Sequence, residues 1–249
     1  YDDWAAQGCT GWGYDDVLPY FKKSEQNTDP HLDDTLHGRS GPLSVVQQRD
    51  PNAIDYAFIE AAKQLQMSTC TDFNVASPEG VGIYQVTQKD GRRHSTAAAF
   101  LHEITDRANL QVETDAYVER VSSTQDDTSV TLRRPDGTQQ IIHGRCEVIL
   151  SAGAIGSPDI LLRSGIGSGT TLQKCGTPVA YNLSGVGQNL HDHVNVIVIA
   201  KSTSITPYGV SLKALPKLTG DALKWIFARR GMLSSNMVEA GGFARSSPS

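Results

Sequence analysis

The residues best suited to binding a ligand form a run of small side chains that leads into a predicted helix. Glu147–Ala152 is a short, apolar, partly β-branched stretch, typical of a strand buried on both faces of a parallel sheet. Gly153 and Gly156 follow it, and their lack of a side chain lets the backbone approach a ligand closely. Ser157 suits the N-cap of the next helix and Pro158 its first position. Because a helix N-terminus beyond the carboxyl end of a strand favours phosphate, this order predicts a phosphate-binding turn.

The same run also fits an ordinary connection between a strand and a well-capped helix. Asp159 lies near the positive end of the helix dipole, Arg163 lies near the negative end, and Gly165 can end the helix. These signals serve either interpretation, so the residues alone leave both open.

Two histidines flank an aspartate in the segment Asn189–His193. On a strand, His191 and His193 would share a face, and with Asp192 between them they suggest a metal site. The sequence supplies no convincing third ligand, so we expect no metal.

Hydrolase chemistry lacks its usual signatures in this chain. Gly165–Gly169 places its serine one position too late for the Gly-x-Ser-x-Gly turn, and neither Ser-x-x-Lys nor His-Glu-x-x-His occurs. Serine, histidine and aspartate are all present, but their presence alone does not indicate a triad.

Composition limits the classes of protein to which the chain can belong. Its 249 residues predict one or two domains, and a net charge of −5 without a basic stripe argues against a nucleic-acid partner. No apolar run approaches the roughly 20 residues of a transmembrane helix. The four cysteines are widely spaced, which slightly favours a reduced, cytoplasmic protein, although export stays open because the N-terminus looks incomplete. A homo-oligomer is possible.

Hydrophobic periodicity and capping residues predict the elements that would position these residues. The predicted helices are Asp15–Ser24 with Asp15 or Asp16 as cap, residues 52–66, Ser95–Ile104 with Ser95 or Thr96 as cap, and one or two helices in Leu212–Arg229 around Pro216. The predicted strands, besides Glu147–Ala152, are Val81–Thr87, Leu110–Val121, Ser129–Arg134, Thr138–His143 and Val194–Ile199. Pro135-Asp136-Gly137 is a strong hairpin signal between two of them, so the sequence predicts a β-meander.

The stretch Gly153–Gly167 resembles the second signature of the glucose-methanol-choline (GMC) family of flavin oxidoreductases. Further matches follow the order of the family: Trp4, Gly11–Glu25, His37-Gly38, Gly41–Leu43, Thr71–Asn74, Glu79–Gly82, Gly91–Thr96, Phe100-Leu101, Arg107, Asn109-Leu110, Gly185–His193 and Glu239–Phe243. The chain looks most similar to the bacterial choline and aliphatic-alcohol dehydrogenase branch.

This resemblance implies a fold of mixed α/β and α+β class. We expect an incomplete, Rossmann-like FAD-binding domain with a β-meander, together with part of an antiparallel-sheet substrate domain. Residues 1–40 would be a covering or lid segment, 41–90 and 191–249 would belong to the substrate domain, and 91–190 would belong to the FAD-binding domain.

Two features of the family are absent from this sequence. No Gly-x-Gly-x-x-Gly turn occurs, and nothing matches the family's C-terminal segment with its catalytic histidine. We therefore expect a central fragment of a longer protein, and we assign no catalytic residue.

The resemblance also implies roles for individual residues. The backbone of Val118 would meet the adenine edge of FAD, although by pattern alone Val118 is a packing residue. Asp192 and His193 would make structural hydrogen bonds near the flavin. The residues expected to contact the cofactor are Val118, Ser151, Ala152, Gly153, Ser157, Asp192 and His193.

Glu239 is the candidate on the substrate side. A carboxylate in an aromatic pocket would attract a quaternary ammonium by charge, and the aromatic rings would add cation–π contact. The alternative is a structural glutamate that is hydrogen-bonded to backbone, so the substrate stays open.

The resemblance predicts that the parent protein is an FAD-dependent alcohol dehydrogenase or oxidase. It would oxidise a primary alcohol, choline-like or aliphatic, to an aldehyde by transferring hydride from the α-carbon to flavin N5. The electron acceptor is unknown, and the dehydrogenase branch favours one other than oxygen. The alternative is a truncated, stand-alone protein or binding module that is not catalytic and lacks flavin.

Overall fold

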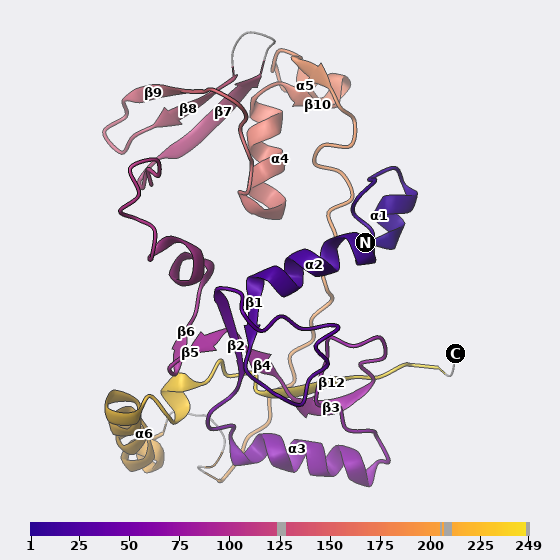
Figure 1. Cartoon of the computed structure of the whole chain (residues 1–249), viewed down its shortest axis with the longest axis vertical. Coiled ribbons are helices and arrows are strands. Elements are labelled where there is room, and N and C mark those ends of the chain that lie inside the picture. Colours follow the sequence, from indigo (N-terminus) through magenta and orange to yellow (C-terminus); the bar gives the residue numbers. More distant parts are fainter. Residues whose placement is uncertain (124–127, 205, 207–210, 248–249) are drawn as a thin grey trace. The chain divides into compact units, whose positions relative to one another are not determined.

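A computed structural model describes residues 1–123, 128–204, 206 and 211–247 of the chain. It has the expected mixed α/β character and divides into two compact units (Figure 1). Unit 1 comprises Tyr1–Leu110 with Ile199–Ser249, and unit 2 comprises Gln111–Val198. These boundaries differ by up to about twenty residues from the domain limits expected above, and the assignment of segments to flavin and substrate domains stays a prediction.

Unit 1 is built on short strands in three small sheets. The strand pairs are β1 (Glu25–Asn27) parallel to β2 (Leu43–Gln47), β2 antiparallel to β4 (Gln85–Val86), β3 (Gly80–Ile83) antiparallel to β12 (Ala240–Phe243), and β5 (Gln88–Lys89) antiparallel to β6 (Arg92–Arg93). The single strand predicted over Val81–Thr87 is therefore two strands. It divides at Tyr84, whose amide N donates to the carbonyl of Glu239 at 2.9 Å, so that β3 pairs with β12 and β4 with β2.

The strands β3 and β12 approach neighbouring backbone so closely that side chains are excluded. A Cβ atom on Gly82 would overlap the carbonyl oxygen of Cys70, and one on Gly242 would overlap the carbonyl oxygen of Gly80. Val81, between these contacts, is 2% exposed and belongs to the core of unit 1. The glycines of both strands are thus required by packing.

The helices of unit 1 mostly begin where the sequence predicts. They are α1 (Asp2–Ala6), α2 (Tyr14–Ser24), α3 (Ala53–Gln64), the π-helical turn η1 (Ala97–Leu101), η2 (Leu212–Ala214), α6 (Leu215–Ala228) and η3 (Met232–Ser234). Asn52 caps α3 through Oδ1, which accepts from the amide N of Ile54 at 3.1 Å. No helix in the described part of the chain combines the length and the apolar character needed to cross a bilayer.

Three details of these helices correct the predictions. The N-cap of α2 is Gly13 rather than an aspartate, and Asp16 accepts from the amide N of Gly13 at 3.0 Å from inside the helix. The helix predicted over Ser95–Ile104 is reduced to η1, although Ser95 Oγ does accept from the amide N of Ala98 at 3.2 Å. Pro216 does not interrupt α6 but lies in its first turn, where the missing N–H is harmless.

Unit 2 contains the predicted β-meander. Strands β7 (Tyr117–Ser123), β8 (Thr128–Arg133) and β9 (Gln139–Gly144) are antiparallel neighbours, and α4 (Gly153–Arg163) contacts β7. The short pair β10 (Ile166–Gly167) and β11 (Tyr181–Asn182) and the helix α5 (Gly169–Lys174) complete it. The predicted hairpin turn joins β8 to β9, but β7 begins at Tyr117, seven residues later than expected, since the preceding residues have no strand partner.

Two predicted strands are wrong in this structure. Glu147–Ala152 and Val194–Ile199 form no strand, because no described strand lies beside either segment to accept and donate hydrogen bonds. Several of their apolar side chains are therefore exposed: Ile149 is 77% exposed and Val194 is 95% exposed. An apolar β-branched pattern indicates suitability for a sheet, whereas a strand also requires a neighbour.

Candidate functional site

The start of helix α4 carries the predicted phosphate-binding turn. The helix begins at Gly153, four residues before the predicted N-cap Ser157, which therefore lies inside it. The Ser157 hydroxyl accepts a hydrogen bond from the amide N of Ala152 at 2.9 Å. Gly153 has φ +83°, a conformation that favours glycine, and apart from the adjoining residues and the backbone of its own helix no atom lies within 4 Å of the position of its missing Cβ.

This helix start has the chemistry that an anionic group requires. Ser151, Ala152 and Gly153 are exposed, and no side chain caps the first turn of α4. The first N–H groups of a helix lack intrahelical acceptors and carry the positive end of the dipole. The small residues and the open space at Gly153 thus fit a diphosphate such as that of a dinucleotide.

Val118 lies at the opposite end of α4. Its carbonyl oxygen accepts from Arg163 Nη1 at 3.1 Å, and the nearby amide N of Val121 donates to Ser164 Oγ at 2.9 Å. Gly153 and Arg163 are ten residues apart along the helix, or about 15 Å at 1.5 Å per residue. The backbone of Val118 and Val121 thus contacts side chains from the C-terminal end of α4, whereas Ser151–Ser157 form the N-terminal start of the same helix.

Asp192 and His193 lie in a segment without secondary structure and are exposed. Asp192 Oδ1 accepts from the amide N of His193 at 2.8 Å. Over residues 1–123, 128–204, 206 and 211–247, no group of histidine, cysteine, aspartate and glutamate is arranged to hold a metal ion. A role for these two residues beside a flavin stays a prediction.

Glu239 is the most deeply buried large side chain of unit 1, at 1% exposed. It directly precedes β12, and its Oε2 accepts from the amide N of Asn52 at 2.6 Å. The carbonyl oxygen of Glu239 accepts from Tyr84 N at 2.9 Å and from Gln48 Nε2 at 3.4 Å. These contacts with backbone amides are what the alternative interpretation predicts, in which Glu239 is a structural residue hydrogen-bonded to backbone.

Asp55 is an unpredicted partner of Glu239. Burial first, and then the hydrogen bond to Glu239 and its negative charge, raise the pKa of Asp55 from 3.8 to about 6. Both carboxyl groups lie at the N-terminus of α3, whose dipole favours negative charge there. The sequence gives no signal for this pair, because Glu239 is 187 positions from Asn52, the residue that it contacts.

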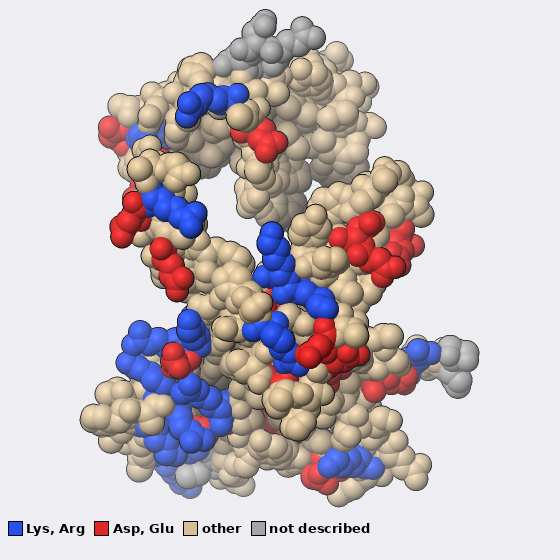
Figure 2. Space-filling view, in the orientation of Figure 1, with Lys and Arg blue, Asp and Glu red and all other residues tan. Residues whose placement is uncertain are grey.

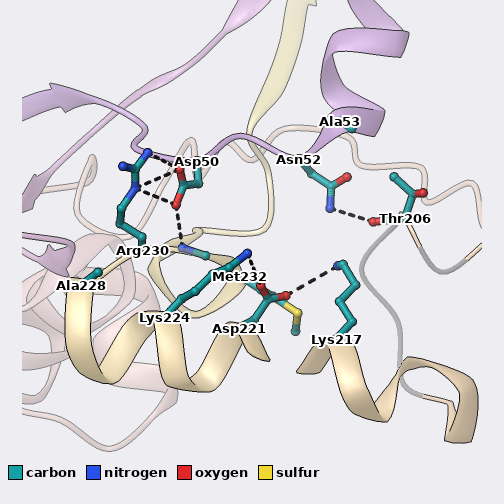
Figure 3. Close-up of a pocket in the computed structure, with 11 residues that line it drawn as sticks. Asp50, Asn52, Ala53, Thr206, Lys217, Asp221, Lys224, Ala228, Arg230 and Met232 are labelled. Atoms are coloured by element: carbon teal, nitrogen blue, oxygen red, sulfur yellow. Dashed lines mark hydrogen bonds and ion pairs between the residues drawn. The ribbon is translucent and has the colours of Figure 1, made fainter. Parts of the chain in front are cut away.

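A pocket of about 590 Å³ opens beside the start of α3 (Figure 3). Asp50 accepts from Arg230 Nη2 at 2.6 Å and from the amide N of Gly231 at 2.8 Å, and the Arg230 hydrogen bond lowers the pKa of Asp50. Asp221 lies 3.7 Å from the amino groups of Lys217 and Lys224. Three cations and two carboxylates line this pocket, so its charge disfavours a quaternary ammonium.

His37 forms a second buried polar cluster in unit 1. The ring is 3% exposed, with Nδ1 3.1 Å from Glu25 Oε1 and Nε2 2.9 Å from Asp72 Oδ2. Burial lowers the pKa of His37, but the hydrogen bonds to the two carboxylates outweigh it and raise the pKa overall. Motif matches at His37 and Thr71–Asn74 identified these residues by position, but only the structure shows that they meet.

Comparison with known proteins agrees with this picture. Residues 1–195 match the sequence profile of the GMC oxidoreductase family. The chain is 38% identical over 251 residues to an alcohol dehydrogenase (acceptor) of Pseudomonas putida, covering 100% of this chain and 45% of that protein. It is 35% identical over 249 residues to the mitochondrial choline dehydrogenase of Mus musculus, covering 100% of this chain and 41% of that protein.

Among solved structures, an FAD-dependent oxidoreductase from Chaetomium thermophilum matches with a TM-score of 0.81. That match covers 96% of this chain and 44% of the other at 24% identity, so it concerns the fold. The chain spans less than half the length of each of these relatives.

Proposed function

The chain belongs to the GMC oxidoreductase family, and from this premise we propose that its parent protein oxidises a primary alcohol to an aldehyde. The family membership supports FAD as the cofactor. When bound, FAD would supply the acceptor for the hydride that leaves the α-carbon of the alcohol.

The observation that carries the proposal is the open start of helix α4. The amide groups at Gly153 and the residues after it would hold the diphosphate of FAD, with Ser151 and Ala152 beside it. Ser157 would keep the turn in place through its hydrogen bond with Ala152. Val118 would present its backbone to the adenine edge, and Asp192 and His193 would lie nearer the flavin.

For the substrate, we favour an uncharged aliphatic alcohol over choline. Glu239 already accepts from Asn52 N and shares a hydrogen bond with Asp55, so its carboxylate is engaged within unit 1. The pocket beside α3 is lined by three cations and two carboxylates, which leaves one positive charge in excess. The relative from Pseudomonas putida, named an alcohol dehydrogenase, supports the same choice.

Flavin content tests the role of the α4 turn. In the full-length protein, Gly153→Val should lower the FAD that remains after free flavin is removed, because a β-branched residue is strained at φ +83° and fills the open space. Gly176→Val is the matched control, since Gly176 also has a positive φ of +70° and open space. Visible absorbance per protein gives the readout, and equal FAD loss in both variants would contradict the assignment.

Activity is tested separately by dye reduction and aldehyde formation with aliphatic alcohols and with choline. An uncharged alcohol should be oxidised more efficiently than choline, as measured by kcat/KM. A holoenzyme that oxidises no primary alcohol would refute the proposed reaction, whatever its flavin content.

A non-catalytic, GMC-derived protein is the second candidate. The segments Glu147–Ala152 and Val194–Ile199 favour it, because they form no strand in the described structure and a cofactor site beside them lacks a supporting sheet. This candidate predicts a cooperative thermal transition of the 249-residue chain without flavin retention, whereas stoichiometric retention would exclude it.

A further inference from the structure

Arg163 connects the last turn of α4 to the backbone of β7. Its Nη1 atom donates to the carbonyl oxygen of Val118 at 3.1 Å and also to the carbonyl oxygen of Glu119. Asp159, one turn earlier in α4, accepts from Arg163 Nε at 3.0 Å and from Nη2 at 2.9 Å. The planar guanidinium is thus held from two sides, and its charge strengthens each hydrogen bond.

The two carbonyl groups lie at an irregularity of β7. Val118 and Arg120 lie opposite consecutive residues of β8, so Glu119 is an extra residue in β7, as in a β-bulge. A bulge disrupts the ladder locally, and its freed backbone groups need partners from outside the sheet. The guanidinium of Arg163 is such a partner for the carbonyl of Glu119. The local course of β7 therefore depends on a side chain of α4.

Arg163 also marks the edge of β7 that Val118 faces. In a strand, the N–H and C=O groups of one residue point to the same side. The Val118 carbonyl meets a side chain of α4, so both backbone groups of Val118 face away from β8. A carbonyl oxygen has two lone pairs, which lets Val118 accept from Arg163 and from one further donor. An adenine edge, which offers a donor amino group beside an acceptor nitrogen, matches the N–H group and the remaining lone pair.

We propose that Arg163 is a positioning residue for the adenosine part of FAD. Its guanidinium would hold the carbonyl groups of Val118 and of the bulged Glu119, so that the backbone edge of Val118 faces the adenine ring. Asp159 would act one step further away, by orienting Arg163. The inference rests on the proposed function, since it takes FAD as the cofactor.

A second contact holds α4 beside β7 without Arg163. Ser164 Oγ accepts from the amide N of Val121 at 2.9 Å and donates to the carbonyl oxygen of Ile160 at 2.6 Å. Ile160 is 7% exposed and belongs to the core of unit 2. Removal of the Arg163 guanidinium should therefore leave α4 packed on β7 and free only the carbonyl groups of Val118 and Glu119.

Arg133 separates the effect of contact from the effect of charge. Its guanidinium, like that of Arg163, lies 5.2 Å from the centre of the Tyr117 ring. Arg133 pairs with the side chain of Glu119, with Nε 3.0 Å from Oε1, whereas Arg163 binds the backbone carbonyl of Glu119. In the described part of the chain, Arg133 makes no hydrogen bond with a backbone carbonyl of β7. It is therefore a matched control.

Unit 2 has no excess of positive charge that could replace these contacts. Asp and Glu outnumber Lys and Arg over residues 111–198. On the face shown in Figure 2, Lys and Arg side chains gather over unit 1 and are sparse over unit 2. An effect on FAD that is confined to Arg163 can thus be assigned to the contacts of this residue.

The flavin affinity of the full-length apoprotein tests the proposal. FAD and FMN share the flavin, but FMN lacks the adenosine part. In Arg163→Gln the Kd of FAD should rise about tenfold, because hydrogen bonds from a charged group are lost, while the Kd of FMN should not change. Arg133→Gln should leave both dissociation constants near those of the wild type. Flavin fluorescence gives the readout, and the thermal midpoint verifies that each variant is folded.

Asp159→Asn tests the same contact from its other side. The variant keeps an oxygen that can accept from Arg163 but removes the charge, so the Kd of FAD should rise by a smaller factor, about threefold. If Arg163→Gln does not fold, an unchanged FAD affinity in Asp159→Asn would overturn the proposal. If FMN binds too weakly to be measured, the difference in FAD affinity between Arg163→Gln and Arg133→Gln decides the question.

The outcomes distinguish this inference from the proposed function. A wild type that binds FAD, with the same affinity as Arg163→Gln, would overturn the inference and leave the proposed cofactor in place. An equal loss of FAD and FMN affinity would also overturn it, because a purely structural role would affect both flavins, and so would an equal loss in Arg133→Gln. A wild type that binds no FAD would overturn the proposed function together with the inference.

Discussion

The buried carboxyl pair of unit 1 gives a prediction that depends on a single proton. Replacing Glu239 by glutamine keeps an oxygen that can accept from Asn52 N, and it turns the other group into a donor for Asp55. The negative charge that raises the pKa of Asp55 disappears. We therefore expect the pKa of Asp55 to fall from about 6 toward its ordinary value of 3.8.

The size and sign of the effect on stability follow from linkage. The folded wild type keeps a proton that the unfolded chain releases between about pH 4 and pH 6, so the pair's contribution to stability decreases as pH rises through this window. A shift of about two pKa units corresponds to about 3 kcal/mol, and the variant removes only the part of it that comes from Glu239, because burial of Asp55 remains. Because the Asp55 side chain is only partly buried, solvent screening should reduce this to about 1–2 kcal/mol.

The assay is the free energy of unfolding in urea, measured at several pH values across the window. Relative to Glu239→Gln, the wild type should lose about 1–2 kcal/mol between acidic and neutral pH. Glu60→Gln, an exposed change on the same helix, should leave the wild-type profile unaltered. Parallel profiles for wild type and Glu239→Gln, together with an ordinary Asp55 titration in carboxyl NMR, would refute the shared proton.

Two further changes test other parts of unit 1. His37→Gln should destabilise the protein by about 3 kcal/mol at acidic pH, because it leaves Glu25 and Asp72 without their buried cation. Since the pKa of His37 is raised, the stability lost in His37→Gln should become smaller as pH rises through that pKa. If the difference in urea midpoint between wild type and variant does not change with pH, His37 is not charged in the folded protein. Asp50→Asn should cost about 1 kcal/mol of stability at neutral pH, because it weakens the pair with Arg230. The cost should be small at strongly acidic pH, where the wild-type carboxyl is protonated. A thermal midpoint that is lowered equally at both pH values would argue against this pair.

Local chemistry explains which elements could be predicted from the sequence. The helix predicted over residues 52–66 is α3 (Ala53–Gln64) with Asn52 as cap, and Pro135-Asp136-Gly137 joins two strands as predicted. Both could be predicted because caps and turns depend on neighbours along the chain. The start of α4 was misplaced for a local reason too. Ser157 lies inside the helix, and its hydroxyl accepts from the amide N of Ala152. It therefore provides an acceptor for an amide at the start of the helix, as an N-cap residue would, but from a position within the helix.

Contacts between distant segments explain the rest. The apolar pattern of Val194–Ile199 indicates a strand, but no sequence rule states which neighbour is present. Similarly, Glu239 could be singled out by its motif, while its contact with Asp55 exists only because β12 returns beside the start of α3. The predicted cofactor residues were located within unit 2, and their contact with FAD stays a prediction.

The close approach of β3 and β12 has a consequence for how this protein can change over evolutionary time. At Gly82 and Gly242 any amino-acid substitution would add a Cβ where a carbonyl oxygen already lies, so selection for folding should remove nearly all substitutions there. Packing therefore prevents substitution at these positions, whatever the substrate is. A search for determinants of substrate choice should therefore begin at positions where side chains have room to vary, rather than at these two glycines.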